Sequence, residues 1–151
     1  MDASPNLLGA PFTDEELAAW HGMLSLQAHV LREIDVALNR VHRISVREFD
    51  VLITLTNAPN RRLRMTDLAQ RVMLSPSGLS RLVDRLQRDG LVVREPDPDD
   101  ARGARTAITD AGQRKLDEAR ATHNTVIREH FIYRWSAEDL RRLGDIWRTF
   151  E

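Results

Sequence analysis

The stretch MTDLAQRVMLSPSGLSRLVDRL, at residues 65–86, constrains the fold more than any other part of this 151-residue chain. Ser75 and Pro76 stand at its centre, and serine followed by proline is the residue order of a helix start. The apolar residues that follow share one helix face: Leu79, Leu82, Val83 and Leu86. A shorter apolar pattern comes before them, with Thr66 as its expected N-cap. The stretch therefore predicts two helices joined by a tight turn at residues 73–75.

The residues after this helix pair predict a β-hairpin. Gly90 is suited to end the second helix. The apolar runs LVVRE at 91–95 and TAIT at 106–109 are typical of short strands, and PDPDDARGAR at 96–105 between them predicts a loop. The order helix, short helix, helix, hairpin is that of a winged helix-turn-helix. In that arrangement the second helix of the pair can enter the DNA major groove with its N-terminus first.

A long helix is expected before this lobe, because Thr13 and Glu16 form a capping box and the apolar pattern continues to about His42. Its leucines recur every seventh residue, as in a coiled-coil seam: Leu17, Leu24, Leu31 and Leu38. A helix of this length carries more apolar surface than a small lobe needs. The pattern favours a homodimer, with packing inside one chain as the alternative.

Three further helices are indicated by their first residues. They begin at Ser45, at Thr109 or Asp110, and at Ser136, and they end at residues 57–62, about Tyr133 and near Phe150. The expected fold is mainly α with a small β-hairpin wing, a winged helix-turn-helix with long N- and C-terminal dimerisation helices. Its expected parts are an N-terminal dimerisation helix at 1–43, the winged lobe at 44–109 and C-terminal dimerisation helices at 110–151.

Composition narrows the function classes. The chain has no cysteine, which excludes disulfides and thiolate metal sites and is consistent with the cytoplasm. No signal peptide and no membrane-spanning run is indicated. The net charge is −1, yet residues 61–105 hold ten arginines against seven acidic residues.

Enzymatic chemistry is not indicated either. The sequence has no Gly-rich phosphate loop, no H-E-x-x-H and no G-x-S-x-G motif. Its five histidines form no i, i+4 pair with one another, so we expect no metal site and no cofactor.

The second helix of the pair supplies most of the candidate DNA contacts. Its small first residues leave backbone N–H groups accessible to a phosphate, and its hydroxyls and arginines can reach base edges. Arg85 adjoins the buried stripe, so a contact with DNA and an ion pair with an acidic residue are both open. The candidates outside the hairpin are Thr66, Ser75, Pro76, Ser77, Gly78, Ser80, Arg81, Arg85 and Arg88.

The region from 44 to 112 resembles the MarR family of bacterial transcription regulators. The resemblance is carried by EFDVLITL, by RMTDLAQRVMLSPSGLSRLVDRLQRDGLVVREPDPDDAR and by AITDAG. It implies a homodimer whose first helix and last two helices interlock, and in which each wing enters a minor groove. An Asp-x-Arg pair in the family's wing corresponds here to Asp100 and Arg102, with the arginine at the tip and the aspartate steadying it.

Electrostatics favours an arginine at the wing tip but disfavours the acidic residues that precede it. A narrow minor groove favours an inserted guanidinium such as that of Arg102, and Arg105 is expected to add a phosphate contact. The wing is nevertheless acidic before its tip, at Asp97, Asp99 and Asp100. These carboxylates repel phosphate unless they turn away or pair.

The predicted function is therefore a sequence-specific double-stranded-DNA-binding transcriptional regulator, a homodimer on a pseudo-palindromic operator. The resemblance implies a repressor released by a small-molecule effector, commonly an aromatic or phenolic acid. Trp20, Met23, Gln27 and Phe49 are candidates to line the effector cleft, or else belong to the core or an interface. The family that the chain resembles also has a peroxide-sensing branch and a zinc-sensing branch. Peroxide sensing is excluded here, because the reactive cysteine that it requires is missing. The alternative function is a winged-helix protein-interaction module without specific DNA binding.

Overall fold

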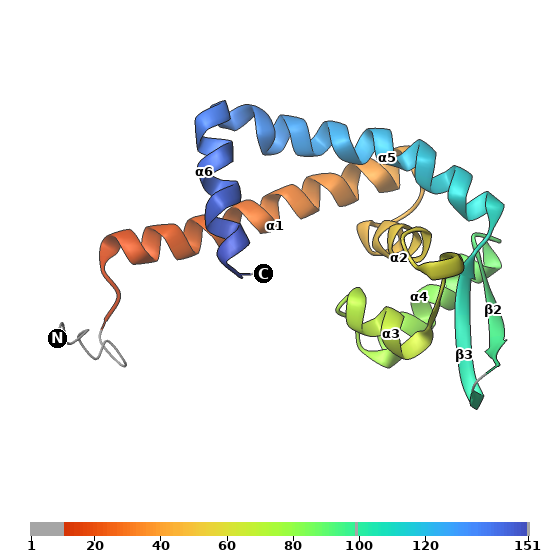
Figure 1. The fold of residues 1–151 in the computed structure, drawn as a ribbon. Helices are drawn as coiled ribbons and strands as arrows, with labels where there is room; N and C mark the ends of the chain where they lie inside the picture. The colour runs from red at the N-terminus through yellow and green to blue at the C-terminus, as the bar shows by residue number, and fades with distance from the viewer. Residues whose placement is uncertain (1–10, 99, 151) are drawn as a thin grey trace.

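The computed structural model describes residues 11–98 and 100–150, without the side chains of residues 100–102. It confirms a mainly helical chain with a small antiparallel sheet (Figure 1). The helices are α1 (Asp14–His42), α2 (Val46–Thr56), α3 (Met65–Arg71), α4 (Pro76–Arg88), α5 (Asp110–His130) and α6 (Ala137–Trp147). The strands are β1 (Arg62–Arg64), β2 (Val92–Asp97) and β3 (Asp100–Ile108), and three 3-10 turns are η1 (Pro59–Arg61), η2 (Ile132–Arg134) and η3 (Arg148–Phe150).

Side-chain caps set the starts of most helices where the sequence predicts them. Thr13 and Ser45 each form a complete capping box with the glutamate three residues later, and Ser136 forms one with Asp139. Hydrogen bonds from the hydroxyl and the backbone N–H of Ser136 hold the pKa of Asp139 below its ordinary value. The expected cap at Thr66 is wrong. The N-cap of α3 is Arg64, the last residue of β1, because a strand leads directly into this helix and leaves no separate cap residue.

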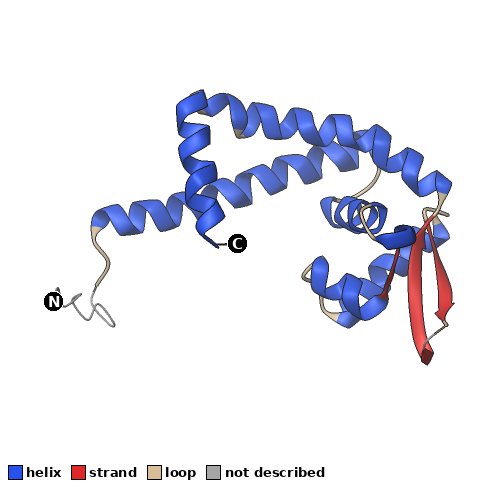
Figure 2. Cartoon of the chain, in the orientation of Figure 1, coloured by secondary structure: helices blue, strands red, loops and turns tan. Residues whose placement is uncertain are grey.

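The sheet is larger than a hairpin (Figure 2). Its strand order is β1-β3-β2, so β3 is central and β1 is a third strand that the sequence did not predict. The expected loop at 96–105 is also wrong, because β2 continues to Asp97 and β3 already begins at Asp100. Pro96 is tolerated because β2 is an edge strand, where a missing N–H need not break a ladder bond. A register shift follows at Pro96/Asp97.

One apolar core holds the lobe together and continues into the long helices. Phe49 and Leu52 of α2 and Leu79 and Leu86 of α4 are buried in this core, and Leu38 and Leu116 bring α1 and α5 into the same cluster. The helices α1 and α5 pack along one another at the side of the lobe (Figure 1). Among the described residues, no helix has both the length and the apolar character needed to cross a membrane.

The start of α5 lies directly against the lobe. The N–H of Thr109 donates to the carbonyl of Leu91 at 3.0 Å, and the Thr109 hydroxyl donates to the carbonyl of Gly90 at 2.7 Å. A Cβ at Gly112 would lie 2.0 Å from the Leu91 carbonyl oxygen. Glycine is therefore required at this position by the close approach of the two backbones.

Candidate nucleic-acid interface

The helix α4 has one buried face and one exposed face. Leu79, Val83 and Leu86 are buried, whereas Arg81 and Arg88 are exposed. The Ser75 hydroxyl accepts a hydrogen bond from the Gly78 N–H at 3.1 Å, which fixes the first turn as the sequence predicts. An apolar stripe on one side and arginines on the other give this helix a surface that can face a phosphate backbone.

The predicted contact residues outside the wing differ in their exposure and in the contacts that they make within the chain. Arg81 has no hydrogen bond or ion pair within the described part of the chain, and its side chain is exposed. The Ser77 hydroxyl lies 3.4 Å from that of Ser75, and the Arg88 Nε donates weakly to the Asp84 carbonyl at 3.4 Å. Exposed side chains are found at Thr66, Ser75, Pro76, Ser77, Arg81, Arg85 and Arg88, and half-buried positions at Gly78 and Ser80.

Ser80 is engaged by an arginine that sequence reasoning missed. Arg94, on β2, donates to the carbonyl and to the hydroxyl of Ser80, both at 3.2 Å, and to the carboxylate of Asp84. These three contacts connect the sheet to α4. No local pattern could have revealed them, because the partners are ten and fourteen residues apart in the sequence.

Arg85 makes the ion pair that the sequence left as one of two alternatives. Its Nε donates to Oε1 of Glu48 on α2 at 2.6 Å. Glu48 is only 4% exposed, and its Oε2 accepts from the N–H and the hydroxyl of Ser45 at 2.7 and 2.8 Å. The carboxylate that completes the cap of α2 thus also anchors α4.

The last residue of β2 carries a buried carboxylate. Only 1% of the Asp97 side chain is exposed, and it pairs with the Nε of Arg64 at 2.6 Å and with Nη2 of Arg105 at 3.0 Å. Asp97 therefore turns inward and is neutralised, which removes one of the three charges that would oppose DNA. The same geometry directs the Arg105 guanidinium toward Asp97. The side chains of Asp100 and Arg102 lie outside the described residues, as does all of Asp99.

The residues considered for an effector cleft do not form one site. Phe49 is buried in the core, where its ring stacks on that of His123 with centroids 4.5 Å apart, whereas Trp20, Met23 and Gln27 are exposed on α1. The described residues contain no cluster of three or more potential metal ligands. His29 and His130 share a hydrogen bond of 3.0 Å between α1 and α5.

Comparison with known proteins places this geometry in a family. A family model described as MarR family matches residues 42–103. Over its fold the chain is similar to Sco3205, a MarR family transcriptional regulator from Streptomyces coelicolor solved in complex with DNA, with 31% identity, a TM-score of 0.84, and 93% and 91% of the two chains covered. AbsC, another MarR family regulator from that organism, is 28% identical with a TM-score of 0.83, covering 93% and 94%.

Curated relatives match a smaller part of the chain. The HTH-type transcriptional regulator YkoM of Bacillus subtilis is 30% identical over 66% of this chain, and the HTH-type transcriptional repressor YetL of the same organism is 29% identical over 69%. The alignments span 60% and 64% of those two proteins. The winged lobe, the long flanking helices and these similarities together show that the chain belongs to the MarR family of transcriptional regulators.

Proposed function

We propose that this chain binds double-stranded DNA sequence-specifically and places α4 in the major groove. The observation that carries the proposal is Arg81, an exposed guanidinium without an intramolecular partner in the described chain, on the face of α4 opposite the buried stripe. A well-placed arginine of this kind distinguishes bases by about 1–3 kcal/mol per bidentate contact. The relative Sco3205 was solved with DNA, which supports the same use of the lobe here.

The other contacts that we propose differ in role. Thr66, Ser75, Pro76, Ser77 and Gly78 are proposed to approach the phosphate backbone around the start of α4. Ser80, Arg85 and Arg105 already bind Arg94, Glu48 and Asp97, so we assign them mainly to holding α4 and the wing in place. Arg88 is proposed to contact phosphate, and Asp100 and Arg102 to form the wing tip.

The proposed binding form is a homodimer. Large apolar side chains remain exposed along α1, in the segment after α5 and at the C-terminal end: Trp20, Met23, Leu24, Leu31, Tyr133, Trp135, Ile146, Trp147 and Phe150. Many large apolar side chains left exposed on these segments support an interface with a second chain. Sedimentation equilibrium should give about twice the 17.3 kDa chain mass, and the mass of one chain at working concentrations would refute the dimer.

Two-fold symmetry then predicts a pseudo-palindromic operator with half-sites about one helical turn apart. We propose that the dimer represses transcription, as the name of the relative YetL records for that protein. Release by a small aromatic or phenolic effector requires that the effector bind the DNA-incompetent geometry more tightly.

Selection of duplexes from a random pool with the purified full chain tests the function. We expect enrichment of one pseudo-palindromic motif, with binding that weakens steeply as salt rises because each neutralised phosphate releases counterions. A protein-interaction module would enrich no motif above the input pool. That result would refute the proposed function.

A further inference from the structure

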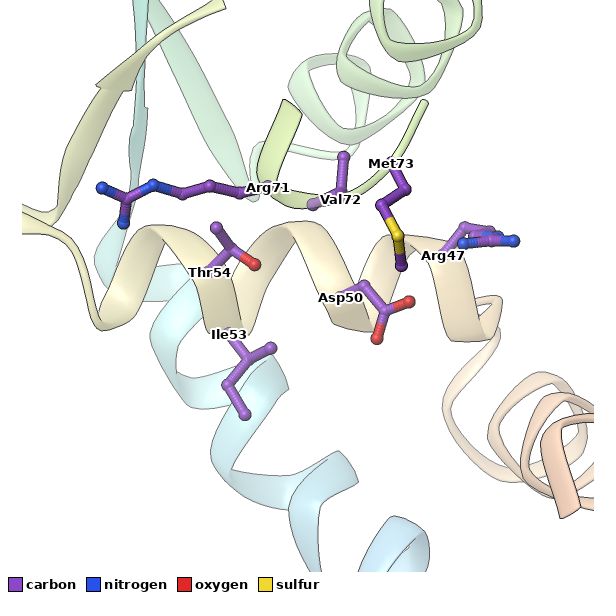
Figure 3. Close-up of a pocket in the computed structure, with 7 residues that line it drawn as sticks. All are labelled: Arg47, Asp50, Ile53, Thr54, Arg71, Val72 and Met73. Carbon is purple, nitrogen blue, oxygen red and sulfur yellow. The ribbon is translucent and has the colours of Figure 1, made fainter. Parts of the chain in front are cut away.

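A hollow lies between α2 and the end of α3 with the turn that follows it (Figure 3). The cavity has a volume of about 240 Å³. Pockets for drug-sized ligands occupy about 300–1,000 Å³, so this one suits a smaller molecule. Its lining residues are Arg47, Asp50, Ile53 and Thr54 of α2, Arg71 at the end of α3, and Val72 and Met73 of the turn after it.

Charges of opposite sign alternate along this hollow. Figure 3 shows Asp50 beneath Met73 in its middle, with Arg47 beyond one end and Arg71 beyond the other. Arg47 precedes Asp50 by three residues on α2, so the two side chains leave the same helix face. Ile53, Val72 and Met73 supply the apolar part of the lining, and Met73 is 85% exposed.

Asp50 is the polar group with unused capacity. Its side chain is half-buried, yet no hydrogen bond or ion pair reaches the carboxylate from anywhere in residues 11–98 or 100–150 whose side chains are described. Burial raises the pKa of Asp50 above its ordinary value, while the charges of Arg47 and His123 act in the opposite direction. A partly desolvated carboxylate gains free energy when a donor from a ligand reaches it.

We propose that this hollow binds a small zwitterion, an α-amino acid with an apolar side chain. The ammonium group would donate to the Asp50 carboxylate, and the carboxylate would accept from the Arg47 guanidinium. The side chain would lie on Ile53, Val72 and Met73.

The charge pattern selects this ligand class over simpler ones. A plain amine is opposed by both Arg47 and Arg71, and a plain carboxylate is opposed by Asp50. An α-amino acid carries both charges one carbon apart, which matches neighbouring opposite charges on one helix face. The proposal needs no DNA, so its failure leaves the proposed function untouched.

The test uses the full chain labelled with ¹³C at its methionine methyl groups and follows their NMR signals. There are four methionines, and the exposed Met73 methyl is assigned from the spectrum of Met73→Leu. L-leucine is the probe. Three relatives each remove one group: 3-methylbutylamine lacks the carboxylate, 4-methylpentanoate lacks the ammonium, and glycine lacks the side chain.

We expect L-leucine to shift the Met73 signal saturably and each of the three partial probes to bind at least about tenfold more weakly. Asp50→Asn and Arg47→Gln should each weaken L-leucine binding by about tenfold or more, because each removes one charged partner. Glu118→Gln, which changes an exposed carboxylate on α5, is the matched control and should leave binding unchanged.

Three results would overturn the proposal. The first is no saturable shift of the Met73 signal with L-leucine. The second is 4-methylpentanoate or the amine binding as tightly as L-leucine, which would indicate a site for one charge only. The third is unchanged L-leucine binding by Asp50→Asn in a variant whose circular dichroism spectrum is native.

Discussion

The ion pair between Arg85 and Glu48 gives the most direct test of how α4 is held in place. The perturbation is Arg85→Ala. It removes the only described donor to Oε1 of a carboxylate that is 4% exposed, and it leaves the two Ser45 donors on Oε2 in place. The variant therefore keeps the capping box of α2 but leaves half of a buried anion without a partner.

The expected loss in the free energy of unfolding follows from the exposure of the two side chains. Breaking a fully buried pair costs about 3–5 kcal/mol, whereas an exposed pair contributes about 1 kcal/mol or less. Glu48 is buried but the Arg85 side chain is 51% exposed, so water partly replaces it. We expect a loss of about 2 kcal/mol, between those limits. For a chain of this size that lowers Tm by about 4–8 °C.

The assay is urea unfolding followed by circular dichroism, at one fixed protein concentration because dimerisation would add to stability. Arg88→Ala is the matched control, since Arg88 lies one turn later and makes a single weak hydrogen bond, to a carbonyl, within the described part of the chain. It should change stability by less than about 0.5 kcal/mol. A double-mutant cycle with Glu48→Gln measures the coupling of Arg85 and Glu48 directly.

The same variants separate the two roles open to Arg85. If Arg85 positions α4, Glu48→Gln should weaken DNA binding even though Glu48 is buried. If Arg85→Ala proves as stable as Arg88→Ala and the cycle gives no coupling energy, the positioning role is refuted. Weakened DNA binding by Arg85→Ala alone would then identify Arg85 as a DNA contact.

Three further predictions concern single positions. Gly112→Ala should destabilise by about 3 kcal/mol in urea unfolding, since its Cβ meets the Leu91 carbonyl, while Gly22→Ala, with open space, should stabilise the helix by up to about 1 kcal/mol. Met73→Gly should stabilise by up to about 1 kcal/mol, because Met73 has φ of 52° and is exposed; a loss of stability would contradict the assigned strain. The pKa of Asp50 is raised in the folded chain above the ordinary value of 3.8, so the folded chain keeps this proton to a higher pH than the unfolded chain does. The contribution of Asp50 to stability is therefore lost as the pH rises from 3.8 through the folded-state pKa. The stability advantage of Asp50→Asn should grow from pH 3 to 7 in thermal unfolding.

Helix starts could be read from the sequence because their causes are local. Thr13, Ser45, Ser75 and Ser136 each cap through a backbone N–H three residues away, so four letters of sequence contain the whole interaction. The family resemblance extended this reading to the wing. These two sources together predicted the fold class and the place of α4.

The features that the sequence did not reveal share one physical cause, which is the distance along the chain between the residues that interact. The strand β1 forms because Leu63 pairs with Thr106 on β3. It is only three residues long, which is too short for an alternating apolar pattern to predict it. The hydrogen bonds of Arg94 to α4 and the burial of Asp97 also depend on residues from other helices and strands. The position of Arg85 beside the buried stripe of α4 left two roles open for it. The sequence could not identify Glu48 as its partner, because the two residues meet only in the folded chain.

Fluorescence anisotropy on the selected duplex measures whether the exposed face of α4 binds DNA through Arg81, as we propose. Titrations with the wild type, with Arg81→Ala and with Arg120→Ala, an exposed arginine on α5, would be run over a range of salt concentrations. We expect Arg81→Ala to weaken specific binding by about 1–3 kcal/mol and to narrow the preference over a scrambled duplex, whereas Arg120→Ala should do neither. Equal affinity of Arg81→Ala and wild type for the selected duplex would contradict it.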